Sequence, residues 1–375
     1  MATSSRSFGA IARTFAAPLA ALALFGLAHA GFLHVETAWV AVLSGVLLLG
    51  SVFAAVHHAE VVALKVGEPF GSILLAIAVT VIEAALIVSI MVSAPPGASS
   101  VARDTVFSAV IIVLNGVIGL CLVAGGARHR ELAFRVEGTT SALSVLATLA
   151  VMTLVLPNFT VTKLGPQYAP NQLILVSVLS LILYGVFVFV QSVRHRDYFL
   201  ADEPAPALAD DLGSAQDESK NLPSTGATLF SAVLLVASLV AVILLAKTLS
   251  PALERGIAVV GLPPSFIGVV IAALVLLPES GAAIIAARAN RIQTSLNLAL
   301  GSAIASIGLT IPTVAVVSLA FDQQIALGVS QTDMTLLVLT LYVSALTFGT
   351  GRTTVLQGAV HLVIFAAFML VSAVP

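Results

Sequence analysis

The sequence predicts an all-α integral membrane protein of about eleven transmembrane helices, arranged as two inverted five-helix repeats plus one N-terminal helix. Composition is the first reason: 59% of the 375 residues are hydrophobic and only 9% are charged, proportions that soluble globular domains do not approach. Apolar stretches of about 20 residues, enough for a helix to cross a bilayer, recur along the whole chain. One long polar stretch near the middle divides these segments into two similar halves.

About eleven apolar segments are predicted to be membrane-spanning helices. The first could also be a signal peptide, because Arg6 and Arg13 precede an apolar stretch that contains Ala28-His29-Ala30. A retained first span fits the distribution of charges better. The predicted spans are residues 14–33, 39–58, 70–93, 105–127, 139–157, 171–192, 227–248, 264–287, 294–318, 332–350 and 355–373.

The lysine and arginine residues predict the orientation, because cytoplasmic loops of membrane proteins are enriched in them. With the N-terminus inside, four of the 16 basic residues fall in external segments, which leaves 12 in cytoplasmic ones. The four are Arg103, Lys163, Lys247 and Arg255. We therefore expect a cytoplasmic N-terminus and an external C-terminus.

The polar stretch over residues 194–226 is predicted to be a flexible cytoplasmic linker. Its acidic residues lie among Pro, Ala and Ser, a composition that buries too little apolar surface to fold alone. A cation-sensing role for these acids is the alternative. The linker separates a first repeat, residues 39–193, from a second, residues 227–375, and residues 1–38 hold the N-terminal helix. The acids are Asp202, Glu203, Asp210, Asp211, Asp217 and Glu218.

Each half has five predicted spans, and an odd number forces the two halves into opposite orientations. Inverted repeats of this kind are a transporter architecture with the binding site near the bilayer midplane. Each half also carries one glutamate in the middle of its second span, Glu83 and Glu279. An ionised carboxylate at that depth is costly without a cation beside it, and no apolar segment offers a mid-span Lys or Arg. The two acids therefore indicate a cation site.

Polar neighbours of the two glutamates are candidate supporting residues. Thr80 lies one turn before Glu83 on the same helical face. Pro278 precedes Glu279 and removes a helical donor, which leaves carbonyl oxygens available beside Glu279 and Ser280. The next span in each half is small and polar, and Ca²⁺ needs six to eight oxygens, more than two carboxylates supply. These further candidates are Asn115, Asn297, Ser302 and Ser306.

Other readings of these residues stay open. A lone buried Glu can be a protonated structural element, and Asn and Ser also act as hydrogen-bonding contacts between membrane helices. His57, His58 and Glu60 form a cluster that fits the membrane interface better than a metal or proton-sensing site. His361, inside the last span, fits a packed side chain better than a functional one.

The chain resembles the cation/Ca²⁺ exchanger superfamily, and within it the bacterial calcium/proton antiporters of the ChaA type. Residues 67–71 (Gly-Glu-Pro-Phe-Gly) with the Glu83 segment, and residues 278–280 with 297–312, look like the two α-repeats of that superfamily. The resemblance implies that Glu83 and Glu279 bind the ion and carry the protons, and that Asn115 and Ser302 to Ser306 belong to the paired repeat helices. The first repeat departs from the vacuolar branch, with Val79-Thr80-Val81-Ile82-Glu83 in place of Gly-Asn-Ala-Thr-Glu.

The expected function is secondary transport in a bacterial inner membrane: exchange of cytoplasmic Ca²⁺ for external protons at a shared two-glutamate site by alternating access. A Na⁺/H⁺ or K⁺/H⁺ antiporter using the same site is the main alternative, and a cation channel or an intramembrane metalloenzyme are lesser ones. The chain lacks the clustered His and Asp ligands of such an enzyme. We expect no enzymatic activity, no cofactor besides the transported ions and no nucleic-acid partner, with the lipid bilayer as surroundings.

Overall fold

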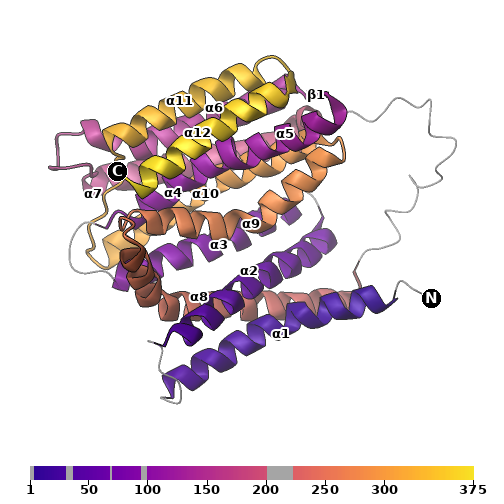
Figure 1. Cartoon of the computed structure of the whole chain (residues 1–375), viewed down its shortest axis with the longest axis vertical. Helices are drawn as coiled ribbons and strands as arrows, with labels where there is room; N and C mark the ends of the chain where they lie inside the picture. Colours follow the sequence, from indigo (N-terminus) through magenta and orange to yellow (C-terminus); the bar gives the residue numbers. More distant parts are fainter. Residues whose placement is uncertain (1–3, 31–36, 68–69, 94–98, 201–222) are drawn as a thin grey trace.

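The computed structural model is a bundle of long helices that run side by side, with α1 starting and α12 ending at opposite ends (Figure 1). The structure describes residues 4–30, 37–67, 70–93, 99–200 and 223–375. Glu68, Pro69 and the acidic residues of the linker lie outside them. Within the described residues, ten helices are long and apolar enough to cross a membrane, and α1 adds a shorter apolar part, Phe15–His29. The prediction of an all-α membrane protein is confirmed.

The first half of the chain contains the helices that precede the linker. Short π- and 3-10 turns, written η, interrupt or end several of them. The elements are α1 (Ser4–His29), α2 (Ala38–Val66), α3 (Phe70–Ser93), α4 (Val101–Ile111), η1 (Ile112–Val117), α5 (Ile118–His129), β1 (Glu131–Ala133), α6 (Val136–Ala150), η2 (Val151–Val155), η3 (Leu156–Phe159), α7 (Pro170–Phe189), η4 (Val190–Arg194) and η5 (Arg196–Phe199).

The second half repeats the pattern of five long helices. Its β2 strand pairs with β1 in an antiparallel register, Glu131 opposite Thr354, which ties the two halves together at one end of the bundle. The elements are α8 (Thr225–Val260), α9 (Phe266–Arg288), α10 (Ile292–Ala320), α11 (Gln331–Phe348), β2 (Arg352–Thr354) and α12 (Val355–Ala373).

Two helices run well beyond their predicted ends. α2 continues through His57, His58 and Glu60 to Val66, and α8 continues through Pro251 to Val260. Proline is tolerated inside a membrane helix because neighbouring groups satisfy the backbone that it frees. Both helices stop at a glycine with positive φ, Gly67 at 76° and Gly261 at 79°, where other residues would be strained.

The helices form two packed groups. α1, α2 and α8 contact one another and bury an apolar face against α3 and α9. These three helices lie together at the bottom of Figure 1. The remaining helices, from α3 to α7 and α9 to α12, share the larger apolar core. The cluster under α1, α2 and α8 is therefore a separate packing unit that meets the core along α3 and α9.

Packing within the larger group is reciprocal between the two halves. α3 packs on α10 while α4 packs on α9, and α7 packs on α10 while α12 packs on α5. This exchange of partners is the pattern that two inverted repeats produce. At the α5–α12 contact the backbones meet closely, since a Cβ on Gly358 would lie 2.9 Å from the carbonyl oxygen of Gly119. Small residues allow this approach between membrane helices.

Candidate cation site

A cavity of about 480 Å³ lies between α3, α7, α9 and α10. Its walls come from the first halves of α3 and α10 and from the last turns of α7, so it extends toward the end of the bundle at which α3 and α10 begin. Glu83 and Glu279 both line it, from opposite halves of the chain. The other polar or charged side chains in its lining are Thr80, Tyr184, Gln191, Ser192, Arg196, Thr294, Asn297, Ser302 and Ser306.

Glu83 lies at the deep, buried end of this cavity. Its side chain is only 3% exposed, and the hydroxyl of Ser306 on α10 donates a hydrogen bond of 2.6 Å to its Oε1. Thr80 lines the cavity one turn away, but its own hydroxyl donates to the carbonyl of Ala76 at 2.8 Å. Of these two predicted supporting residues, Ser306 contacts the carboxylate and Thr80 contacts its own helix.

Glu279 lies in α9, with one carboxylate oxygen, Oε2, buried and without a hydrogen-bond partner among the described residues. Glu83 lines the same cavity. α9 is helical on both sides of Pro278, and Ser280 donates back to the carbonyl of Leu276 at 2.6 Å. Pro278 and Ser280 are absent from the described lining of the cavity. A buried oxygen without a donor is a position that a proton or a cation can satisfy.

Asn297 lines the cavity but is engaged by other polar groups. Its amide nitrogen donates to the carbonyl oxygen of Phe199 at 2.5 Å, and its amide oxygen accepts from Gln293 at 3.0 Å. Ser302 lines the same wall of α10. The side chain of Asn297 therefore holds the segment that follows α7 against α10. The sequence of α10 alone does not predict this contact.

Asn115 lies away from the cavity, in a buried network between three helices. Its amide nitrogen donates to Thr340 at 2.8 Å, and its amide oxygen accepts from His361 Nδ1 at 3.1 Å. The other ring nitrogen of His361 lies 3.1 Å from the hydroxyl of Thr347. Asn115 sits in the π-turn η1, whose wider turn departs from the regular 3.6-residue period of an α-helix.

The histidine cluster of α2 also lies outside the lining of the cavity. His58 is buried with its ring 6.0 Å from that of Phe15 on α1, whereas His57 and Glu60 are exposed. Among the described residues, no three His, Cys, Asp or Glu side chains group closely enough to hold a metal ion. A cation between Glu83 and Glu279 would therefore need hydroxyl, carbonyl and water oxygens to complete its shell.

Most of the lining residues that sequence reasoning missed come from α7 and the turns that follow it, and Thr294 of α10 is a further one. Tyr184, Gln191 and Arg196 line the cavity, although neither repeat motif includes them. A signal was present only in hindsight, as Gln191 and Ser192 interrupt the apolar end of the sixth predicted span.

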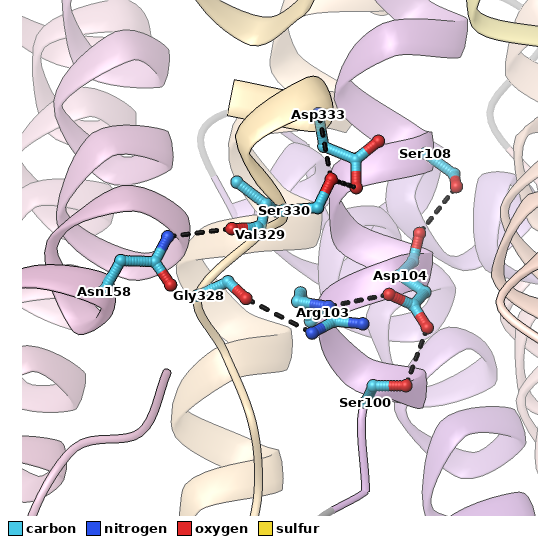
Figure 2. Close-up of polar contacts among 9 residues, drawn as sticks. All are labelled: Ser100, Arg103, Asp104, Ser108, Asn158, Gly328, Val329, Ser330 and Asp333. Carbon is cyan, nitrogen blue, oxygen red and sulfur yellow. Dashed lines mark hydrogen bonds and ion pairs between the residues drawn. The ribbon is translucent and has the colours of Figure 1, made fainter. Parts of the chain in front are cut away.

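The opposite end of the core is closed by polar contacts, shown in Figure 2. Arg103 bonds to Asp104 at 2.8 Å and to the carbonyl of Gly328 at 3.2 Å, so the start of α4 holds the chain before α11. Asn158 donates to the carbonyl of Val329 at 2.8 Å from the other side. Gly268 at the start of α9 fits directly against Asp104. The cavity thus extends toward one end of the bundle, and this cluster holds chain segments together at the other.

The family is established by comparison with known proteins. A family model described as sodium/calcium exchanger protein matches residues 36–193 and 230–374, most of the chain. This chain belongs to that family. It is a family of membrane transporters, so the general activity, transport of cations by exchange, follows from membership.

Individual relatives agree with this assignment. The chain is 53% identical to the protein y4hA of Sinorhizobium fredii over 333 residues, covering 89% of this chain and 88% of y4hA. It is 32% identical to the sodium-potassium/proton antiporter ChaA of Escherichia coli, with 86% of each chain covered. The Ca²⁺/H⁺ antiporter of Aphanothece halophytica is 23% identical, with 84% of this chain and 86% of that protein covered.

Solved structures share the fold. The Ca²⁺/H⁺ antiporter YfkE superimposes with a TM-score of 0.70 at 16% identity, covering 96% of this chain and 99% of YfkE. The H⁺/Ca²⁺ exchanger CAX superimposes with a TM-score of 0.64 at 13% identity, covering 94% of this chain and 87% of CAX. At such identities the likeness concerns the fold alone.

Proposed function

We propose that this exchanger carries Ca²⁺ out of the cytoplasm in return for protons, with Glu83 and Glu279 as the shared binding groups. One observation carries the proposal: the two acids, from opposite halves of the chain, line one cavity. The described lining has a single basic side chain, Arg196, beyond the end of α7, so no lysine or arginine accompanies the acids at depth.

Charge balance explains why the transport is an exchange. Two ionised carboxylates carry a charge of −2, which one Ca²⁺, two protons or two monovalent cations neutralise. The empty, doubly charged site should change sides poorly, because bare charge in a low-dielectric interior costs several kcal/mol. Coupling then follows from competition for the same oxygens, and no cofactor is required. The proton affinity belongs to the pair of acids rather than to either alone.

Alternating access is proposed to use the two packing groups. α1, α2 and α8 would slide as one unit along α3 and α9, since these three helices pack on one another and meet the rest of the bundle along α3 and α9. The distribution of lysine and arginine predicts that the end at which α1, α3 and α10 begin faces the cytoplasm. By that orientation the cavity faces inward, and the Arg103–Asp104 cluster closes the outside. A channel would instead need a path open at both ends at once.

A Na⁺/H⁺ or K⁺/H⁺ antiporter is the second candidate, supported by the name of the relative from Escherichia coli, which is more similar to this chain than the relative named for Ca²⁺. Two monovalent cations satisfy the same charge balance as one Ca²⁺. The hydroxyl and amide oxygens that line the cavity beside the carboxylates can also serve as ligands for Na⁺ or K⁺.

Flux measurements in inside-out vesicles distinguish the candidates. With an imposed pH gradient, addition of Ca²⁺, Na⁺ or K⁺ to the exposed cytoplasmic face should collapse the gradient for each ion that is exchanged. We expect a response to Ca²⁺ at the lowest concentration. A response to Na⁺ and K⁺ alone would support the second candidate, and no response to any cation would refute proton exchange by this chain.

A further inference from the structure

A short segment lines the cavity near the end of the bundle toward which the cavity extends, and it carries a positive charge. We call residues His195–Leu200 the strap; they follow α7 and η4 and include the 3-10 turn η5. Arg196, Phe199 and Leu200 of the strap line the cavity. This inference rests on the proposed function, since it concerns how cations reach the two glutamates.

Hydrogen bonds from α10 and from the start of α6 hold the strap in place. Asn297 on α10 donates to the carbonyl of Phe199, and Arg135 at the start of α6 donates to the carbonyl of Asp197 at 2.7 Å. The ring of Phe199 is buried against Phe187 of α7, with centroids 6.1 Å apart and planes at 84°. Gly138 gives the backbone room to approach, because a Cβ there would lie 2.3 Å from the carbonyl oxygen of Tyr198. These contacts hold the backbone of the strap, and with it the backbone of Arg196, in place.

Arg196 is the one basic side chain among the described residues that line the cavity. Its neighbour Asp197 is exposed and absent from that lining. Every cation that passes from the mouth to Glu83 and Glu279 therefore moves through the field of one guanidinium group. A fixed positive charge in a cation path has no role in attracting the ion.

We propose that Arg196 determines specificity by disfavouring divalent relative to monovalent cations at the mouth of the cavity. The energy of a cation in the field of Arg196 is proportional to its charge, so repulsion is twice as large for Ca²⁺ as for Na⁺. If removal of the charge raises the apparent affinity for a monovalent ion by a factor f, it raises that for a divalent ion by f squared. A unit charge about 10 Å away in water corresponds to f of about 2.

The test compares Arg196→Gln with wild type in inside-out vesicles at low ionic strength. The pH is set above the range in which proton competition changes affinity. For Arg196→Gln we expect apparent affinity to rise about twofold for Na⁺ and about fourfold for Ca²⁺. The affinity of a transported ion is measured from its transport, and that of an ion that is not transported from its inhibition of transport. Arg196→Glu should roughly square both factors, and Arg196→Lys should restore the wild-type ratio. Added salt should reduce all of these differences.

Arg194→Gln is the matched control, because Arg194 is exposed two residues earlier and is absent from the described lining. A second approach changes the charge after folding. The single cysteine of the chain, Cys121, is buried, so the Arg196→Cys variant offers one accessible thiol for cationic, neutral and anionic methanethiosulfonate reagents. Apparent Ca²⁺ affinity should be highest for the anionic product, intermediate for the neutral one and lowest for the cationic one.

Equal factors for Ca²⁺ and Na⁺, or no change with any charge at position 196, would overturn the role of Arg196 while leaving exchange at the glutamates intact. An equal effect of Arg194→Gln would mean that the affinity responds to the overall charge of this surface. That result would also overturn the proposed role of Arg196. Wild-type protein without any cation/proton exchange would instead refute the proposed function, so the two failures are distinguishable.

Discussion

The hydroxyl of Ser306 donates a hydrogen bond of 2.6 Å to the carboxylate of Glu83, a residue 223 positions earlier in the chain. The bond joins α10 of the second repeat to α3 of the first, at the deep, buried end of the cavity. The second repeat therefore completes the surroundings of the first repeat's acid. Neither half can form this contact alone.

Glu83→Gln and Glu279→Gln should each reduce exchange at least about a hundredfold. Removing one carboxylate leaves the charge of a bound, buried cation incompletely compensated, at a cost of about 3–5 kcal/mol. Glutamine keeps the size of the side chain, so both variants should insert and fold. Cation-driven collapse of a pH gradient in vesicles is the measurement, with the exposed Glu137→Gln as control. Exchange at the wild-type rate in either variant would exclude a shared two-glutamate site.

Ser306→Ala should weaken apparent cation affinity about 10- to 100-fold, since a hydrogen bond to a charged group contributes about 1.5–3 kcal/mol. Thr80→Val is the matched comparison, because it removes a hydroxyl from the same cavity that bonds to the Ala76 carbonyl. Its effect should stay within a few-fold. Equal losses in the two variants would mean that the Ser306–Glu83 bond has no special role.

Raising the pH on the cavity side should tighten apparent Ca²⁺ affinity, because protons and Ca²⁺ compete for the same carboxylates. The sign follows from mass action: fewer bound protons leave more of the site free, and the gain levels off once both acids are ionised. Affinities measured at several pH values, in wild type and in Glu279→Asp, test this. An affinity that is constant with pH would place the exchanged protons on other groups.

Asn115→Leu and His361→Phe should lower stability rather than cation affinity. Each leaves polar groups of the buried Asn115–His361–Thr340 network without partners, at about 1–3 kcal/mol per group. Thermal unfolding of purified protein in detergent measures the loss. His361→Gln, which keeps a polar side chain, should be milder. Strongly reduced Ca²⁺ affinity at unchanged stability would return Asn115 to the cation site.

Deletion of residues 201–219 should leave exchange activity, because this acidic stretch has no apolar face with which to join the transport core. The strap that precedes it, through Leu200, is retained. The concentration of Ca²⁺ for half-maximal exchange is the second readout. Complete loss of transport in a well-expressed deletion would make the linker part of the transport machinery.

The sequence by itself determined the membrane helices. A bilayer requires about 20 apolar residues per span, and its hydrocarbon core offers no hydrogen-bond partner to backbone groups, so each span must be a helix. It also pointed to Glu83 and Glu279, because an acid in an apolar span is costly enough to need a reason. Only the tertiary structure decided the partners of these acids. Ser306 reaches Glu83 across more than 200 residues. Asn115, in the π-turn η1, bonds to His361 and does not line the cavity with the two acids. The strap and Arg196 depend on contacts between α6, α7 and α10 that no local pattern encodes, because side-chain direction at a helix interface is set by packing.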